Sequence, residues 1–147
     1  MGFFDNLFKA SGKEKIVFET EQEAFLAILL AVASADGIMA LNEFRQIEKL
    51  LANHPLFAGQ DVAHIYSIVT DKGNSIGGVQ KLLAHAVTRL NGKRKQSVFI
   101  YAVDLVLSDG VVTLEEESIL AELQTCLGVP DSLARATIDV IVAKNQV

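Results

Sequence analysis

The stretch Ala35-Asp36-Gly37-Ile38-Met39-Ala40-Leu41-Asn42-Glu43 returns later in the chain as Ser108-Asp109-Gly110-Val111-Val112-Thr113-Leu114-Glu115-Glu116. In each copy an Asp-Gly pair follows an apolar run, and a Glu stands seven residues after the Asp. The Asp and the Glu recur at the same offset of 73 residues (109 − 36 and 116 − 43). Because Asp-Gly favours a tight turn, each copy predicts a helix–turn–helix corner that carries two carboxylates. We call these stretches the first and second acidic corners.

Apolar residues recur at helical spacing along most of the chain. The run from Ala24 to Ala35 is apolar nearly all round, which places it at the centre of the fold, and the run from Val98 to Leu107 repeats it before the second corner. The sequence therefore predicts an all-α, single-domain bundle of about seven or eight helices with internal pseudo-twofold duplication. Residues 1–18 are expected to form an N-terminal amphipathic segment and linker, and residues 19–147 the helical domain.

Local signals predict where the helices begin and end. Thr20 and Glu23 have the spacing of a capping box, which would start the central helix. The composition of residues 71–78 predicts a loop, and Asn91-Gly92 is expected to close the helix before it. Two short apolar pairs, residues 38–39 and 111–112, are the only strand candidates and would make at most a two-residue bridge.

Composition limits the class of protein. Half of the 147 residues are apolar and 21% are charged, which is typical of a globular domain. The formal net charge of −5 argues against a nucleic-acid partner, because such binding depends mainly on neutralising phosphates. Cys126 is the only cysteine, so we expect a reducing, cytoplasmic environment and a small buried thiol. The N-terminal residues lack the features of a secretory signal.

Each acidic corner resembles half of a calcium-binding EF-hand loop. Asp36-Gly37 and Glu43 match the fifth, sixth and twelfth positions of that loop, but apolar or small residues occupy the first and third positions. If the repeats pack about a twofold axis, four carboxylates would converge: Asp36, Glu43, Asp109 and Glu116. Asp104, Glu115 and Glu117 would add to the negative field. Ligands that are all oxygen favour calcium, magnesium or manganese.

A structural explanation of the same residues stays open. Asp-Gly is a common turn dipeptide, and acidic residues in a first helical turn are favoured by the helix dipole. Thr113 and Glu116 have capping-box spacing, so Glu116 would then serve only the start of its helix. The same explanation fails for Glu43, because Ala40 stands where the threonine would be.

The duplicated Ala/Ser-Asp-Gly-x5-Glu pattern resembles the TerB-like tellurite-resistance family, over roughly residues 21–142. The N-terminal Phe-Phe-Asp-Asn-Leu-Phe is also similar to some members. The resemblance implies a helical TerB-like domain with the paired acidic motifs as its metal-binding positions. It further implies an association with resistance to tellurite and other stresses, and no established catalytic chemistry.

Two functional hypotheses follow. The first is a non-enzymatic domain that binds a divalent cation, or a protein partner, through its acidic corners. The second is a metal-free scaffold in which an apolar N-terminal stripe docks on a protein or a membrane surface. This stripe consists of Phe3, Phe4, Leu7 and Phe8. No base, nucleophile or phosphate-binding motif accompanies the carboxylates, so we expect neither catalytic residues nor an organic cofactor.

Overall fold

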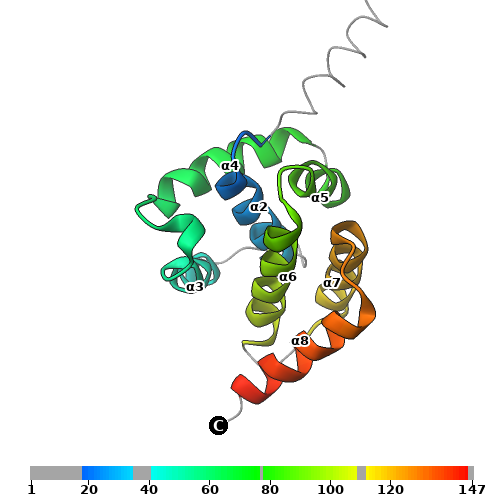
Figure 1. Ribbon diagram of the computed structural model, residues 1–147. Coiled ribbons are helices and arrows are strands. Elements are labelled where there is room, and N and C mark those ends of the chain that lie inside the picture. The colour runs from blue at the N-terminus through cyan, green and yellow to red at the C-terminus, as the bar shows by residue number, and fades with distance from the viewer. Residues whose placement is uncertain (1–17, 35–40, 77, 109–111, 146–147) are drawn as a thin grey trace, which may run out of the picture.

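The computed structural model describes residues 18–34, 41–76, 78–108 and 112–145, apart from the side chains of residues 41–43, 74 and 75. Within these ranges it is entirely helical, with seven α-helices, one short 3₁₀ helix and no strand, which confirms the predicted all-α class (Figure 1). The helices are α2 (Glu21–Ala33), α3 (Leu41–Leu51), η1 (Pro55–Phe57), α4 (Val62–Ile76), α5 (Val79–Val87), α6 (Gly92–Leu107), α7 (Leu114–Leu127) and α8 (Asp131–Lys144).

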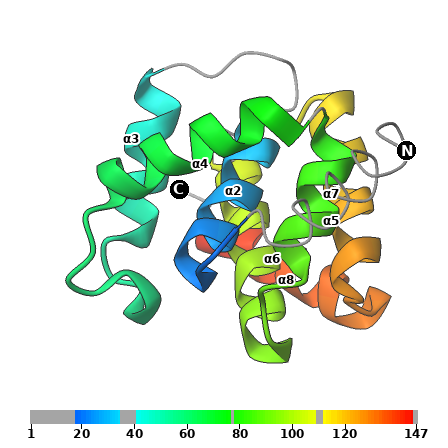
Figure 2. The same cartoon turned by 90° about the horizontal axis from the view of Figure 1, so that it is seen from above.

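Helix α2 is the centre of the fold, as its apolar sequence predicts. Every residue from Glu23 to Val32 is buried, and α2 packs against α4, α5, α6 and α7 (Figures 1 and 2). A helix that is apolar on all sides is removed from water only when other helices surround it. The other described helices each contact α2 or α6.

A cluster of aromatic rings joins α2 to α6 and η1. The Phe25 ring lies 5.0 Å from that of His54 and 5.7 Å from those of both Phe57 and Tyr101, measured between centroids. The Phe25 ring meets the rings of Phe57 and Tyr101 nearly edge-on, an arrangement that aromatic pairs prefer. Because Phe25 has no exposed surface, this cluster belongs to the core.

The start of α2 agrees only partly with the predicted capping box. Thr20 Oγ1 accepts a hydrogen bond from the Glu23 amide at 3.1 Å, as expected. The Glu23 carboxylate instead accepts from the Lys72 ammonium at 2.7 Å and, at 3.4 Å, from the amide of Glu19. The glutamate therefore joins α2 to α4 while Thr20 caps the helix.

The loop predicted over residues 71–78 is wrong for most of its length, because α4 continues to Ile76. Lys72 reaches the nearly buried Glu23, and the Ile76 side chain lies in the core. Gly73 faces Leu82 of α5, and a Cβ at this position would make an ordinary van der Waals contact of 3.5 Å with that side chain. These tertiary contacts outweigh the weak helix propensity of the segment. Only Gly78, with a φ of 134°, departs from helical geometry in the described part of the segment.

The role predicted for Asn91-Gly92 is also wrong. Helix α5 ends at Val87, and Asn91 caps the start of α6 by accepting a hydrogen bond from the Arg94 amide at 2.9 Å. Asparagine suits either end of a helix, so the dipeptide alone did not decide between them.

Cys126 is exposed on the outer side of α7, so the prediction of a buried thiol is wrong. Partial desolvation and the Glu122 carboxylate raise the pKa of this thiol.

The N-terminal stripe and most of the two strand candidates lie outside the described residues. Val112, which is described, is not in a strand. None of the described helices is both long and apolar enough to cross a bilayer.

Candidate functional site

Helices α2 and α6, which lead into the two acidic corners, begin side by side. The Arg94 side chain in the first turns of α6 lies 3.9 Å from the Glu21 carboxylate at the start of α2. Arg89, just before α6, donates to the carbonyl of Phe18 at 2.7 Å. The two helices pack together and run in the same direction (Figure 2). Both acidic corners therefore leave the helix pair at its opposite end, after Ser34 and Ser108.

A hydrogen bond joins the flanks of the two corners. Gln46, one turn beyond Glu43 in α3, donates from Nε2 to the Ser108 hydroxyl at 2.6 Å. Ser108 immediately precedes Asp109, and its hydroxyl in turn donates to the Leu105 carbonyl at 2.8 Å. Helix α3, which follows the first corner, thus contacts the start of the second corner. In the same way, α7, which follows the second corner, packs against α2, which leads into the first corner.

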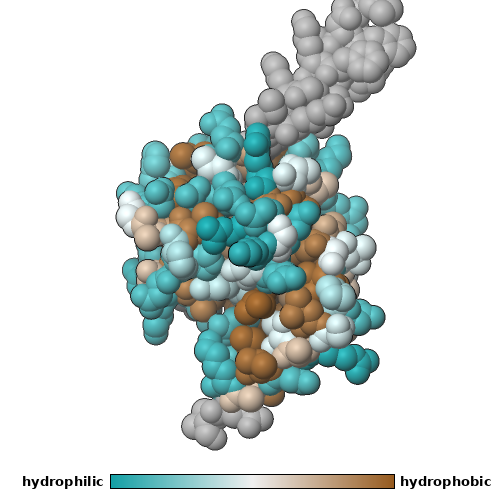
Figure 3. Space-filling model, viewed as in Figure 1, coloured by the Kyte–Doolittle hydropathy of each residue, from teal (hydrophilic) through white to brown (hydrophobic). Residues whose placement is uncertain are grey.

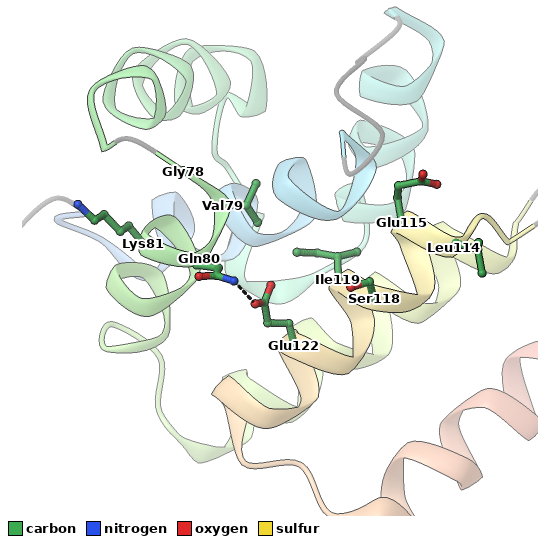
Figure 4. Close-up of a pocket in the computed structure, with 9 residues that line it drawn as sticks. All are labelled: Gly78, Val79, Gln80, Lys81, Leu114, Glu115, Ser118, Ile119 and Glu122. Carbon is green, nitrogen blue, oxygen red and sulfur yellow. Dashed lines mark hydrogen bonds between the residues drawn. The ribbon is translucent and has the colours of Figure 1, made fainter.

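A groove of about 690 Å³ lies between the start of α5 and the first turns of α7 (Figure 4). Gln80 and Glu122 face each other across it and are joined by a hydrogen bond of 2.7 Å. Glu115 projects from the first turn of α7 at one end of the groove. Its lining residues are Gly78, Val79, Gln80, Lys81, Leu114, Glu115, Ser118, Ile119 and Glu122.

A second groove, of about 380 Å³, lies between α2, α4 and α5. It reaches Ser34, the last described residue before the first corner, and shares Gly78 and Val79 with the larger groove. The start of α5 therefore lies between the end of α2 and the start of α7. The described flanks of both corners border this one region of the surface.

The predicted ligands are only partly within the described residues. Asp36 and Asp109 lie outside them, and Glu43 belongs to α3 but its side chain is outside as well. Glu116 is described: its Oε1 accepts from the Thr113 amide at 3.0 Å, while Thr113 Oγ1 accepts from the Glu116 amide at 3.1 Å. This confirms the capping box at the start of α7.

A family model described as "Tellurite resistance protein TerB" matches residues 22–137 of the chain. The match covers most of the chain, including both acidic corners and all the described helices apart from the first residue of α2 and the end of α8. The chain belongs to the TerB family. No curated protein and no solved structure matches it.

The described part of this TerB domain holds no group of three or more Asp, Glu, His or Cys side chains placed to bind a metal ion. Three of the four predicted ligand side chains lie outside that part. Asp104 does not add to the field at the corners as expected, because its carboxylate pairs with Lys144 of α8 at 2.7 Å. Glu115 borders the larger groove and is exposed.

His54 is a buried ionisable residue whose role the sequence did not indicate. The His54 side chain is 5% exposed, and its Nδ1 accepts a hydrogen bond from the Leu56 amide at 3.0 Å. Its Nε2 lies 2.9 Å from the Ser97 hydroxyl. An imidazolium has no acceptor nitrogen, so this arrangement requires the neutral ring. Burial, and then the charge of Arg94, lower the pKa of His54 below 6.5.

This lowered pKa predicts a loss of stability in acid. Between the folded pKa of His54 and 6.5 the unfolded chain binds more protons, so the free energy of unfolding falls as the pH drops below 6.5. One titrating group can change the free energy of unfolding by at most about 1.4 kcal/mol per pH unit. His54→Asn keeps an acceptor for the Leu56 amide but does not titrate. Urea melts from pH 7.5 to 5 are therefore expected to give a shallower pH dependence for the variant, and equal slopes would contradict this account.

Proposed function

We propose that this TerB domain is a cytoplasmic, non-enzymatic protein associated with tellurite resistance, whose two acidic corners bind one divalent cation together. Asp36, Glu43, Asp109 and Glu116 are the proposed ligands. The cytoplasmic setting is supported by the single exposed thiol of Cys126. The cation would connect the two halves of the fold and take no part in a reaction.

The parallel packing of α2 and α6 is the observation that carries this proposal. Because the two helices begin together at Glu21 and Arg94, the corners that follow them start at the same end of the molecule. The Gln46–Ser108 hydrogen bond supports the approach of Glu43 to Asp109, since each bonded residue is a close neighbour in sequence of one ligand. An antiparallel pair would have placed the corners at opposite ends.

The donor set fits a hard cation. All four proposed ligands are carboxylates, which suit calcium, magnesium or manganese better than zinc. The capping role of Glu116 does not prevent ligation, because its hydrogen bond to Thr113 uses one carboxylate oxygen and the other can bind the cation. Capping and metal binding are therefore compatible at the second corner.

Thermal unfolding of the chelator-stripped protein tests the proposal. A ligand at 100 times its Kd stabilises the folded state by about 2.7 kcal/mol. For a chain of this size that corresponds to a rise in Tm of about 5–10 °C. We expect the rise with calcium, magnesium or manganese, and its loss in Asp36→Asn plus Asp109→Asn.

The matched control is Asp71→Asn plus Asp139→Asn, which makes the same change in charge at exposed positions of α4 and α8. It should keep the rise in Tm. No shift of the unmodified protein at millimolar metal, or an equal shift in both double variants, would overturn the cation site. The remaining hypothesis would then be the metal-free scaffold that uses the N-terminal stripe.

A further inference from the structure

An apolar groove between α6 and α8 is open to solvent. Its volume is about 190 Å³, and almost all of its surface is apolar. The lining residues are Ile100, Leu133, Ala136, Thr137, Val140 and Ile141. Val140 is 64% exposed and Ile100 37%. Figure 3 shows apolar side chains gathered over the part of the molecule where α6 meets α8. Burying such a surface would stabilise the protein in proportion to the apolar area removed from water.

In the other half of the molecule a helix covers the corresponding surface. The 73-residue offset equates α2 with α6 and Ala27 with Ile100. Helix α5 packs on α2, and Ala27 there is completely buried. Val79 and Leu82 of α5 line the groove between α2, α4 and α5 together with Ala27. None of the described helices takes the equivalent place on α6.

The apolar spacing of α5 recurs in the N-terminal segment. Val79, Leu82 and Leu83 stand at the same intervals as Phe4, Leu7 and Phe8. The offset between the two sets is 75 (79 − 4 and 83 − 8), two residues longer than the offset between the corners. Two extra residues in the polar stretch at 11–15 would account for this difference in offset.

We propose that the N-terminal segment of this chain, through Phe4, Leu7 and Phe8, docks in the groove between α6 and α8 as the repeat counterpart of α5. Each half of the molecule then consists of an amphipathic helix, a linker, a central helix, an acidic corner and two outer helices. The first helix of each half packs across the axis onto the central helix of the other half. Phe4, Leu7 and Phe8 thereby become core residues.

The linker is long enough for this placement. The described chain begins at Phe18, and the Glu21–Arg94 contact places the start of α2 beside the start of α6. Ile100 is six residues beyond Arg94, which is about 9 Å along the helix. The ten residues from Phe8 to Phe18 span up to about 35 Å when extended and about 15 Å when helical.

Disulfide trapping in the full-length chain tests the docking. In a Cys126→Ser background, Phe8→Cys is combined with Val140→Cys, or with Leu114→Cys as the control. Leu114 is 79% exposed and borders the groove beside α5, so its accessibility is at least that of Val140. We expect an intramolecular disulfide to form at least tenfold faster with position 140. Equal rates, or a faster reaction at position 114, would overturn the proposal.

Tryptophan fluorescence gives a second readout, because the chain has no tryptophan. The emission of Phe8→Trp should be blue-shifted in buffer, independent of protein concentration, and should move toward the solvent-exposed value when Val140→Asp is added. A blue shift only at high concentration, with intermolecular disulfides, would assign the stripe to a second copy. A blue shift only with vesicles of anionic phospholipid would assign it to a membrane surface. Either result would contradict docking within the chain.

Discussion

Phe25→Ala is expected to lower the free energy of unfolding by about 3–5 kcal/mol, the usual range for removing a fully buried aromatic side chain. Phe25 has no exposed surface and lies among the rings of His54, Phe57 and Tyr101. The substitution leaves a cavity at the point where α2, η1 and α6 meet. The ring contacts there add about 0.5–1.5 kcal/mol per pair beyond the area that they bury.

The control for this variant is Leu114→Ala. It also removes an apolar side chain from a helix, but Leu114 is 79% exposed, so the change in stability should stay within about 0.5 kcal/mol. Urea denaturation followed by circular dichroism measures both. A loss below about 1 kcal/mol for Phe25→Ala would show that the ring cluster does not contribute to the core as its geometry indicates.

Much of the fold could be predicted because local signals and tertiary packing agree. The uninterrupted apolar run of α2 identifies a helix that is surrounded by others, and the Thr113–Glu116 pair identifies the start of α7. Both features depend on neighbours in sequence. The resemblance to the TerB family rests on another local feature, the duplicated Asp-Gly-x5-Glu pattern, and the family match over residues 22–137 confirms it.

The errors occurred where distant residues decide the structure. The continuation of α4 through Asp71 and Lys72 depends on Glu23, which lies 49 positions earlier. His54 is held by Ser97 and Tyr101 of α6, more than 40 positions later in the chain, so no local pattern indicates its place in the core. A buried Cys126 was the expectation because free cysteines are usually buried, yet this thiol is exposed on α7.

The geometry of the site was predictable only in part. The duplication predicted that the corners would meet, and the common start of α2 and α6 supports that expectation. The role of Asp104 was not predictable, since Lys144, its partner, lies 40 positions away. The grooves that flank the corners involve α5, which belongs to neither acidic motif and whose apolar spacing predicts a helix but not a binding site.

A cation shared between the corners has a second large consequence: each corner should be unable to bind it alone. Each copy supplies only half of the oxygen ligands that a calcium loop uses. Removing one carboxylate from either corner should therefore raise the Kd for the cation by at least tenfold, which is about 1.4 kcal/mol of binding free energy. Two independent half sites would respond differently, because a substitution at one corner would leave the other unchanged.

Isothermal titration calorimetry of the chelator-stripped full-length protein separates these cases most directly. The protein is titrated with calcium, magnesium or manganese, together with the single variants Asp36→Asn and Asp109→Asn and the control Asp139→Asn. We predict one cation per chain in the unmodified protein and in the control, and at least tenfold weaker binding in both corner variants. Two cations per chain, unchanged binding in either corner variant, or no binding to the unmodified protein at millimolar metal would contradict a shared site.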